Sequence, residues 1–553
     1  MAKSAGSIAP PIMNDAIRNR GVAFSEEERQ KLDLVGRLPS GHLSLDEQAA
    51  RTYAQLRHMP NALHKNIFLE LLHHRNETLY YKVLSEHLTE LLPIIYDPTV
   101  GEAIRQYSDE YRGARGVYLS IDRSDDMEKS FASLGLGPDD VDLIVCTDAE
   151  EILGIGDWGV NGMQISTGKL AVYTAGGGID PGRTIAVSLD VGTDNEMLLN
   201  DPYYIGNRHV RHRGEDYDAF IKRYIETASR LFPQAILHFE DFGPEHARKI
   251  LVDYADKYRM FNDDVQGTGV IVLAAAIAAL KESGVAWKDQ RLVVFGAGSA
   301  GVGIADQIHA AIVAGGASPD QAAGQIWLVD KQGLLFEDTP DLRDFQRPYV
   351  KKRSDVPWAA PGGETSLLDT VRGARPTILL GTSTVPGAFT REVVEAMSAA
   401  TARPIILPIS NPTEKMEAMP ADVIRWSKGK ALVAVGIPVA PLEYDGTTYT
   451  IGQANNFLAY PGIGLGTTVC RAKLVTPAML RAAAGAIASM VRTAGLGSPL
   501  LPDVENIRAA SAIVAHAVVE AAIRDGVATV KPTNITEAVQ DAMWKIEYPE
   551  VGP

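Results

Sequence analysis

Cysteine is almost absent from this chain, with Cys146 and Cys470 as its two occurrences in 553 residues. Two thiols far apart in the sequence, neither in a C-x-x-C pattern, cannot supply a disulfide framework for a chain of this length. We expect both to be reduced, buried and structural. A disulfide-stabilised secreted scaffold is therefore excluded.

Basic residues are fewer than acidic ones, with 53 Lys and Arg against 69 Asp and Glu and a net charge of −16. This balance disfavours nucleic acid and anionic membranes as partners, because both attract basic surfaces. Long apolar runs are also missing, since none approaches the roughly 20 residues that a membrane span needs. Residues 1–11 have neither the apolar segment of a secretory signal nor the arginines of a transit peptide. We expect a cytoplasmic protein that acts on small molecules.

The length of the chain predicts more than one domain, because 553 residues exceed what a single hydrophobic core usually organises. We expect an α/β fold that begins with a flexible tail over residues 1–20 and a helical region over 21–115. An α/β catalytic domain over 116–267 precedes a doubly wound, Rossmann-type parallel-sheet domain over 268–454. The Ala-rich helical C-terminus, 455–553, is expected to pack back on the catalytic domain.

Short β-like runs support this division. In the catalytic domain they are separated by Gly-rich turns and helical pieces, whereas in the Rossmann-type domain they alternate regularly with helical segments. The runs are residues 141–146, 184–189 and 235–239 in the first domain and 291–295, 325–329, 377–380, 404–409 and 431–435 in the second.

A Gly-x-Gly-x-x-Gly sequence follows the apolar strand at 291–295 and opens a helical segment, the context in which this fingerprint binds a dinucleotide. Its glycines let the backbone approach a pyrophosphate at the helix N-terminus. The expected cofactor-binding residues here are Gly296, Gly298, Ser299 and Gly301. Asp330 ends the next strand and is placed to accept both ribose hydroxyls, although it lies 29 residues beyond Gly301, further than the usual spacing of about 20. An insertion between the two elements accounts for the excess.

Carboxylates are clustered after two aromatic-flanked strands. Glu240 and Asp241 follow the first strand, and Asp264 follows the second. An isolated acidic pair is usually solvated or caps a helix, but two strand-end clusters that bring three carboxylates together favour a Mg²⁺ or Mn²⁺ site, because both ions prefer hard oxygen ligands. Asp263 is a candidate to orient a catalytic base.

Lys169 and Tyr96 give weaker signals. In its ordinary interpretation Lys169 is a surface lysine, but burial beside a cation would lower its pKa enough for it to act as a base. Tyr96 is ordinarily a core aromatic. Pro93 is expected to end the preceding helix, so that residues 94–96 are extended and Tyr96 stands at a strand-to-helix corner.

Seven motifs occur in order along most of the chain. They are Tyr96-Asp97-Pro98-Thr99-Val100-Gly101, Ile152-Leu153-Gly154-Ile155-Gly156-Asp157, Gly168-Lys169-Leu170, Phe239-Glu240-Asp241-Phe242, Phe261-Asn262-Asp263-Asp264, Ser410-Asn411-Pro412-Thr413 and Ala454-Asn455-Asn456. Together they resemble the ordered signatures of the malic enzyme family, which malolactic enzymes share. The match extends from residue 19 to about residue 466.

This resemblance implies oxidative decarboxylation of L-malate to pyruvate and CO₂ with reduction of NAD. It implies that Glu240, Asp241 and Asp264 bind Mn²⁺ or Mg²⁺. It also implies that Lys169 is the general base, that Tyr96 is the general acid and that Asp263 has a catalytic role. Contacts with the substrate or the nicotinamide are implied for Asn411, Asn455 and Asn456, and a place beside the cofactor for Asp264 and Asn411. Members of the family form dimers and tetramers, so a homodimer or homotetramer is expected.

Some positions depart from the malic enzyme pattern. Most malic enzymes carry a substrate-gripping arginine where this chain has Glu151, so that role is not transferred. Asp97 and Trp158 resemble malolactic enzymes, which convert L-malate to L-lactate and CO₂ with bound NAD and Mn²⁺, and this activity is the alternative. A third hypothesis is a catalytically silent NAD-binding regulator, against which the retained Tyr96 and Lys169 argue.

The choice of coenzyme is predicted from the end of the second Rossmann strand. The charge of Asp330 should repel a 2′-phosphate, and the resemblance places a neutral residue such as Gln346 in NAD enzymes. NAD is therefore the expected coenzyme. Arg347, next in the sequence, could still admit NADP.

Overall fold

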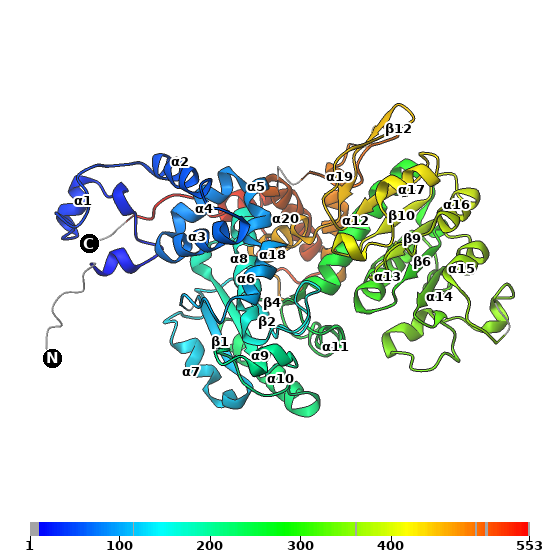
Figure 1. Ribbon diagram of the computed structural model, residues 1–553, viewed down its shortest axis with the longest axis horizontal. Coiled ribbons are helices and arrows are strands. Elements are labelled where there is room, and N and C mark those ends of the chain that lie inside the picture. Colours follow the sequence, from blue (N-terminus) through cyan, green and yellow to red (C-terminus); the bar gives the residue numbers. More distant parts are fainter. Residues whose placement is uncertain (1–9, 114, 360–361, 493–494, 504–506, 551–553) are drawn as a thin grey trace. The chain divides into compact units, whose positions relative to one another are not determined.

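The computed structural model describes residues 10–113, 115–359, 362–492, 495–503 and 507–550 (Figure 1). The chain forms two compact units, Met1–Phe242 with Gln540–Pro553 and Gly243–Val539. Residues 1–9 of the predicted flexible tail lie outside the described residues. The rest of that segment is ordered, in contrast to the prediction: a short 3-10 helix spans Pro11–Asn14, and buried Asn19 donates hydrogen bonds of 2.9 Å to the carbonyls of Met13 and Arg75.

Helices make up most of the first unit before its sheet begins. The predicted helical region is confirmed, and its first helix has the capping box expected from Ser25 and Glu28, whose side chains each bond the other's backbone N–H. The helices of the unit are α1 (Glu26–Lys31), α2 (Leu45–Leu56), α3 (Ala62–Arg75), α4 (Glu77–Glu86), α5 (Leu88–Ile95), α6 (Thr99–Arg105), α7 (Met127–Ala132), α8 (Met163–Gly177), α9 (Glu196–Asn200) and α10 (Gly214–Leu231).

The prediction that Pro93 ends its helix is wrong. Helix α5 continues through Pro93 to Ile95, so Tyr96 stands between two helices rather than after a strand. A proline removes one backbone donor from a helix, and here that loss is offset because the residues around it, including Leu92 and Ile94, are buried.

A parallel sheet forms the core of the first unit, as predicted. Its strands β1 (Gly116–Ser120), β3 (Thr184–Asp190), β2 (Leu143–Thr147) and β4 (Ile236–Phe239) lie side by side in that order, and each neighbouring pair is parallel. Every residue of β2 is buried, which explains its uninterrupted apolar run. Helix α8 packs against β2 and β3 and so holds Lys169 beside the sheet.

Residues 544–548, which follow the second unit in the sequence, belong to the first unit. The backbone N–H of Trp544 donates to the carbonyl of Gly178 at 2.7 Å, and its ring lies 5.5 Å from that of Tyr81. Further on, the Tyr548 hydroxyl accepts hydrogen bonds from the amides of Gln48 and Asn76. This segment therefore completes the packing of α2 and α4.

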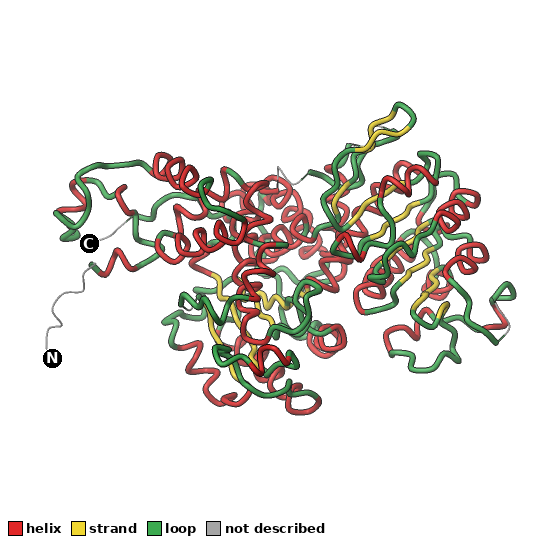
Figure 2. Tube along the Cα trace, viewed as in Figure 1, coloured by secondary structure: helices red, strands yellow, loops and turns green. Residues whose placement is uncertain are grey.

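The second unit contains the predicted doubly wound sheet (Figure 2). Its strand order is β14-β11-β10-β9-β6-β7-β8, and all its neighbours are parallel except β7 and β8. The order reverses between β6 and β9, which is the position where doubly wound sheets bind nucleotides. The strands are β6 (Leu292–Phe295), β7 (Ile326–Asp330), β8 (Gly333–Leu334), β9 (Ile378–Gly381), β10 (Ile405–Pro408), β11 (Leu432–Val435) and β14 (Gly452–Gln453); β5 (Met260–Asn262) and the hairpin β12 (Leu442–Tyr444) and β13 (Thr447–Tyr449) also belong to this unit.

Helices flank this sheet and extend the unit beyond it. They are α11 (Pro244–Tyr254), α12 (Thr268–Ser283), α13 (Ser299–Ala314), α14 (Pro319–Gly324), α15 (Leu367–Ala374), α16 (Arg391–Ala400), α17 (Pro420–Trp426), α18 (Tyr460–Val469), α19 (Pro477–Met490) and α20 (Ile507–Arg524). The last helix, α21 (Ile535–Ala542), begins in this unit and ends beyond its last residue, Val539. The stretch Asp263–Ser283, which includes α12, is long and apolar enough to cross a membrane by length and composition, but 78% of its most apolar window is buried inside the protein. It therefore has the character of a core helix.

The boundary between the units differs from the predicted domains. The second unit begins at Gly243 rather than at residue 268, and it retains the chain as far as Val539. Residues 455–539 thus belong with the dinucleotide-binding unit, whereas packing on the catalytic domain was predicted. The physical reason is α12, which is apolar on all sides and buries one of them against α19, while α20 packs on α18 and α19.

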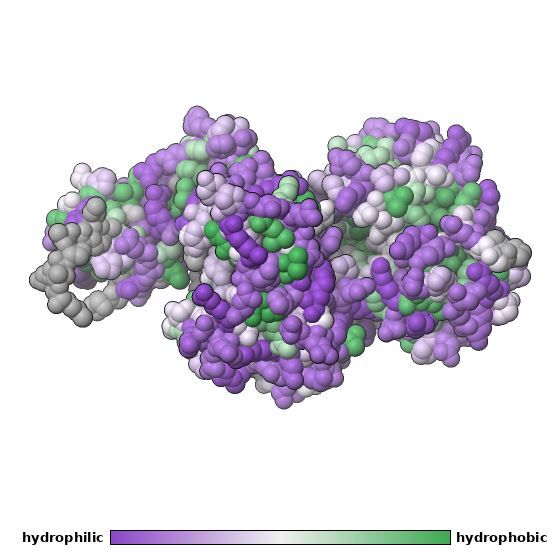
Figure 3. Space-filling view, turned by 60° about the horizontal axis from the view of Figure 1, so that its bottom comes forward, coloured by the Kyte–Doolittle hydropathy of each residue, from purple (hydrophilic) through white to green (hydrophobic). Residues whose placement is uncertain are grey.

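The surface is mostly hydrophilic on the face drawn in Figure 3, with hydrophobic residues in small scattered groups. Both cysteines are buried, as expected, and both are free thiols. Burial raises the pKa of the Cys470 thiol to about 11, so it stays protonated at neutral pH.

Candidate active site

Two carboxylates stand where β4 ends. Glu240 and Asp241 follow the strand directly, are 2% and 5% exposed, and bring carboxylate oxygens within 4.8 Å of each other. Asp241 has φ of +54°, a left-handed conformation that is uncommon for a residue other than glycine and costs about 1–3 kcal/mol. The fold thus holds two negative side chains together at the carboxyl edge of a buried parallel sheet.

Lys169 and Tyr96 converge on Glu240. The Lys169 Nζ lies 2.7 Å from Glu240 Oε1, and the Tyr96 hydroxyl donates to the same oxygen at 2.9 Å. The Lys169 Nζ also lies 4.9 Å from the centre of the Tyr96 ring. Gly168 permits this approach, because a Cβ there would lie 3.2 Å from the Tyr96 ring and 3.1 Å from the carbonyl of Ile95. The structure therefore brings the predicted base, acid and carboxylate into one buried cluster.

His238 and Tyr173 complete this cluster, and the sequence analysis did not identify either. His238 Nε2 is 2.8 Å from Glu240 Oε2, and the Tyr173 hydroxyl is 2.8 Å from His238 Nδ1. Because an ionised carboxylate only accepts, Nε2 donates to Glu240 and a neutral imidazole accepts from Tyr173 through Nδ1. Periodicity is the signal that could have found them: His238 is two residues before Glu240 along the strand, and Tyr173 is four residues after Lys169 on α8.

The neighbours of Glu240 stabilise its ionised form. Burial alone would raise its pKa, but the ammonium of Lys169 and the hydrogen bonds from His238 and Lys169 lower the pKa well below its usual range. Asp97, one residue after Tyr96, behaves differently, because burial raises its pKa and Lys169 offsets that effect in part. Lys169 thus lowers the pKa of both carboxyl groups, but burial outweighs this effect at Asp97 only.

Glu151, at the position where the resemblance would place an arginine, lies beside Asp241. Its backbone N–H donates to the Asp241 carbonyl at 3.2 Å, and the N–H of Leu153 donates to Asp241 Oδ2 at 3.3 Å. The loop before α8 therefore fixes Asp241 through backbone groups. The Glu151 side chain is exposed and acidic, so it offers no cation to a substrate carboxylate.

The second unit places Asp263 and Asp264 in a π-helical turn, Asp263–Gly267, that leads into α12. Asp263 is 1% exposed, and its Oδ2 accepts from the Asn456 amide at 3.1 Å; Asp264 is half-buried. The same amide lies 3.0 Å from the Thr268 hydroxyl. Asn456, predicted to bind substrate, therefore positions Asp263 here, and Asn455 caps the backbone N–H of Phe457 at 3.2 Å.

The three fingerprint glycines fulfil three different requirements. Gly296 has φ of +101°, and a Cβ there would lie 2.5 Å from the backbone of Thr382 and Ser383. A Cβ at Gly301 would lie 2.2 Å from the Gly296 carbonyl, so this glycine allows the helix to pack against the strand. Nothing lies within 4 Å of a Cβ at Gly298, which leaves its backbone open to a ligand at the N-terminus of α13. This is the geometry of a dinucleotide-binding turn.

Asp330 ends β7 and is joined to the fingerprint by Gln346. The buried Gln346 amide donates to the Ala297 carbonyl at 2.8 Å and to Asp330 Oδ2 at 3.4 Å. Arg347 is directed elsewhere, since it forms an exposed ion pair of 3.1 Å with Asp344. Ser299, expected to contact the cofactor, donates its hydroxyl to the Pro244 carbonyl at 2.7 Å.

The remaining predicted residue, Asn411, follows β10 and is exposed. Gly436, at the end of β11, leaves room for it, because a Cβ there would lie 2.4 Å from the Asn411 side-chain oxygen. Asn411 thus stands at the carboxyl edge of the second sheet, the edge where nucleotide ligands bind.

The donor groups fit the ligands that the sequence predicts. The adjacent oxygens of Glu240 and Asp241 are hard donors of the type that Mg²⁺ and Mn²⁺ prefer. The open Gly298 backbone at a helix N-terminus fits a pyrophosphate, and Asp330 fits a ribose.

Comparison with known proteins identifies the family. The malic enzyme N-terminal domain matches residues 73–255, and the malic enzyme NAD-binding domain matches residues 265–523. A Bacillus subtilis NAD-dependent malic enzyme is 53% identical over 97% of this chain and 94% of its own, and a Leuconostoc mesenteroides malolactic enzyme is 45% identical over 97% and 99%. The crystal structure of an Entamoeba histolytica malic enzyme has the same fold, with a TM-score of 0.57 and 22% identity over 93% of this chain and 90% of its own. The chain belongs to the malic enzyme family.

Proposed function

We propose that this protein catalyses the oxidative decarboxylation of L-malate to pyruvate and CO₂ with reduction of NAD, assisted by Mg²⁺ or Mn²⁺. The observation that carries the proposal is the buried cluster in which Lys169 and Tyr96 share one oxygen of Glu240. A base and an acid at one carboxylate suit a reaction that removes a proton from oxygen and later delivers one to carbon.

Lys169 is the proposed base for the C2 hydroxyl of malate. Its side chain is 2% exposed, so water does not compete for the amine. The ion pair with Glu240 stabilises the ammonium form of Lys169. The proposed cation site uses the same carboxylate, and a cation bound there would repel the ammonium and so favour the neutral amine that proton abstraction needs. Tyr96 is the proposed acid that delivers a proton to C3 once CO₂ has left.

The protons balance over the reaction. One proton leaves the C2 hydroxyl and one arrives at C3, while the hydride from C2 is carried away separately. Lys169 gains the first proton and Tyr96 gives up the second, so a proton must pass from Lys169 to Tyr96, whose side chains share an oxygen of Glu240, before both return to their starting states. His238 keeps Glu240 oriented throughout, because it holds the second carboxylate oxygen.

NAD and a divalent cation supply the remaining chemistry. NAD, when bound at the fingerprint, accepts the hydride, and a divalent cation, when bound, withdraws electron density from the C2 oxygen. We propose that Glu240 and Asp241 hold the cation together with Asp264, and that Asp330 holds the ribose. Asn411 is proposed to contact the substrate or the nicotinamide ribose.

The fate of the product separates this activity from malate-to-lactate conversion. Malolactic relatives are 43–45% identical over nearly the whole chain, and Glu151 departs from the malic enzyme pattern, so both activities are tested together. Purified protein is incubated with L-malate, Mn²⁺ and NAD while NADH absorbance is followed and pyruvate and lactate are assayed. Equal amounts of NADH and pyruvate support the proposal. Lactate without net NADH establishes the alternative, and intact malate leaves a binding role.

We further propose that the protein works as a homodimer or homotetramer, in line with the family resemblance. Sedimentation velocity at assay concentrations tests this, and a monomer of about the chain mass of 59.6 kDa contradicts it.

A further inference from the structure

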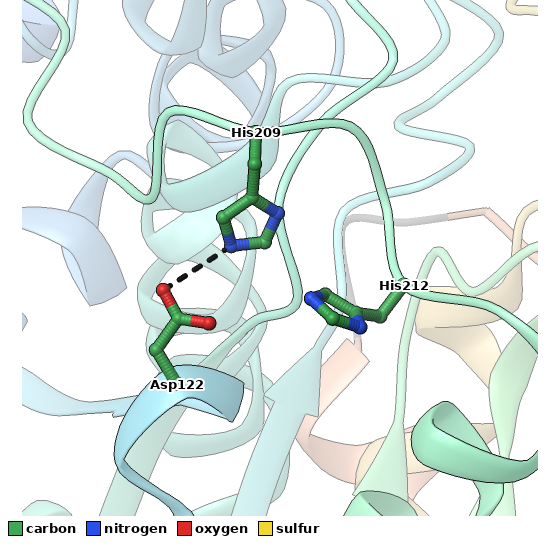
Figure 4. A group of neighbouring side chains, drawn as sticks. All are labelled: Asp122, His209 and His212. Carbon is green, nitrogen blue, oxygen red and sulfur yellow. Dashed lines mark ion pairs between the residues drawn. The ribbon is translucent and has the colours of Figure 1, made fainter.

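Two histidines and an aspartate form a second cluster of ligating side chains in the first unit, separate from the residues assigned to catalysis (Figure 4). Asp122 lies in the 3-10 helix Ile121–Asp126 that follows β1. His209 and His212 lie three residues apart on the segment that follows α9. One potential ligand atom from each of the three lies within 4.8 Å of the other two.

The backbone fixes both histidines against the chain that leaves β3. The N–H of His212 donates to the Val191 carbonyl at 2.9 Å, and the N–H of Thr193 donates to the His209 carbonyl at 3.0 Å. Gly192, between them, has φ of +88°, and a Cβ there would lie 2.6 Å from His209 Nδ1. The position of the His209 ring therefore depends on a glycine at this point.

The hydrogen bonding of His209 sets its tautomer. Its Nδ1 lies 2.8 Å from the Val210 carbonyl, and a carbonyl only accepts, so Nδ1 carries the proton. In the neutral ring Nε2 then presents a lone pair. Metal-binding histidines in proteins are usually held in this way, with the non-ligating nitrogen donating to a carbonyl or carboxylate.

His209 Nε2 faces the carboxylate of Asp122 with the geometry of two ligands rather than of a hydrogen bond. Nε2 and Asp122 Oδ2 are 3.3 Å apart, yet the buried Nε2 makes no hydrogen bond. Nitrogen and oxygen ligands about 2.0–2.2 Å from zinc stand about 3.3–3.5 Å from each other in a tetrahedral site. The observed separation matches that spacing.

His212 supplies the third corner. A ring nitrogen of His212 is turned toward the other two side chains (Figure 4), and the rings of His209 and His212 are perpendicular, with centroids 4.9 Å apart. Its Nδ1 lies 3.8 Å from a carboxylate oxygen of Asp216, so a second carboxylate stands behind the ring. The His209, His212 and Asp122 side chains are 30%, 38% and 51% exposed, which leaves an entry path and a position for water.

We propose that Asp122, His209 and His212 bind a divalent cation of the zinc type, with water as the fourth ligand. Imidazole nitrogen selects zinc, nickel, cobalt and copper, whereas the oxygen ligands of Glu240 and Asp241 select magnesium and manganese, so the two sites differ in their metals. A cation here ties the helical turn after β1 to the loop beyond the neighbouring strand β3, and it thereby stabilises that edge of the sheet.

Zinc titration of the full-length enzyme tests the proposal. The metal-free protein is titrated calorimetrically with Zn²⁺ in excess Mg²⁺, which occupies the oxygen site. His209→Gln and His212→Gln each remove one imidazole, Asp122→Asn removes a charge from an exposed position, and His58→Gln is the control because that histidine is exposed and outside the cluster. Co²⁺ serves as a second probe, since tetrahedral Co²⁺ absorbs visible light far more strongly than octahedral Co²⁺.

One Zn²⁺ per chain is expected for the wild type and for His58→Gln. The two histidine variants should lose it, and Asp122→Asn should weaken it about tenfold or more. Intense Co²⁺ absorption should follow the same pattern. Zn²⁺ should raise the unfolding temperature of the wild type but not that of the two histidine variants. Equal Zn²⁺ stoichiometry in the wild type and both histidine variants, or no Zn²⁺ binding in the wild type, overturns the proposal and leaves a surface contact between imidazole and carboxylate side chains. Unfolding temperatures measured without metal show whether a variant is folded, and Asp122→Asn decides the question if a histidine variant is not.

Discussion

Lys169 and Glu240 form an ion pair of 2.7 Å that is almost completely buried. Removing one member of such a pair leaves a buried charge without compensation and destabilises the protein, whereas replacing both members need not. The structural role of Lys169 needs only its positive charge, whereas its proposed catalytic role requires that it lose a proton. A substitution that keeps the charge can therefore separate the two roles.

Lys169→Arg should keep the charge beside Glu240 but abolish the base, because a guanidinium does not deprotonate in proteins. We expect kcat to fall about 10²–10⁴-fold. Steady-state NADH formation measures the effect. Lys351→Arg is the control, since Lys351 is a half-buried lysine of the second unit, and burial lowers its pKa to about 8. Turnover that is unchanged in Lys169→Arg would exclude Lys169 as the base.

Tyr96→Phe removes the hydroxyl that donates to Glu240 while keeping the ring beneath Lys169. We expect kcat to fall about 10²–10⁴-fold with little change in KM for malate, because the proton is delivered after substrate binds. Tyr107→Phe provides the comparison, since Tyr107 is also buried and its hydroxyl contacts Tyr118 rather than the cluster. Equal losses in both variants would point to a general effect on folding.

His238 is a positioning residue whose substitution should weaken metal binding. Groups that orient metal ligands typically contribute 10- to 100-fold in affinity. We expect His238→Ala to raise the Kd for Mn²⁺ by that factor, with a smaller effect on kcat at saturating Mn²⁺. His238→Gln should recover part of the affinity, because its amide can still donate to Glu240. Calorimetric titration with Mn²⁺ gives the Kd, and an unchanged value in His238→Ala would mean that Glu240 needs no such support.

Coenzyme preference should depend on Asp330 and the Gln346 that contacts it. Replacing the pair by Asp330→Ser with Gln346→Lys removes a negative charge and adds a positive one where a 2′-phosphate would lie. We expect the ratio of kcat/KM for NADP to that for NAD to rise about tenfold or more. Asp344→Ser is the matched control, because Asp344 is a fully exposed neighbouring carboxylate. A ratio that responds equally to the control would indicate a general charge effect.

The stability of the first unit should fall on mild acidification because of His73. Burial, followed by the charge of Arg115, lowers the pKa of His73 from 6.5 to about 4, although Glu77, whose carboxylate lies 2.9 Å from His73 Nε2, opposes the shift. The unfolded chain therefore binds a proton between pH 6.5 and pH 4 that the folded protein refuses. Stability is complete above pH 6.5 and decreases as the pH falls through this window, by about 3 kcal/mol.

Thermal unfolding at pH 7 and pH 5 measures this dependence. His73→Gln should reduce the loss of unfolding temperature, and His58→Gln should leave it unchanged. Part of the loss should remain in His73→Gln, because burial also lowers the pKa of the neighbouring His74 to about 4. Identical pH profiles for the wild type and His73→Gln would contradict the assignment.

Strand positions could be predicted because buried parallel strands are short apolar runs bounded by turns. The run at 291–295 became β6 (Leu292–Phe295), and the run at 404–409 became β10 (Ile405–Pro408). The two-residue strands β8 and β14 were not predicted, because a run of two residues has no period to detect.

Long-range contacts were the part that the sequence could not supply. The cluster at Glu240 joins residues up to 144 positions apart, so no local pattern links Tyr96 to it, and the family resemblance provided that link instead. His238 and Tyr173 were overlooked although each shares a face with a predicted residue. The assignment of residues 455–539 to the wrong unit has the same cause, since it depends on which helix covers α12.

The return of the C-terminus to the first unit has a consequence for synthesis on the ribosome. Domains usually fold in order as the chain emerges. Here Tyr81 and Gly178 find their partner in Trp544, near the end of the chain, after the whole second unit has been translated. The first unit is thus completed only after the second unit has been translated, and a chain released before Trp544 lacks both of these contacts.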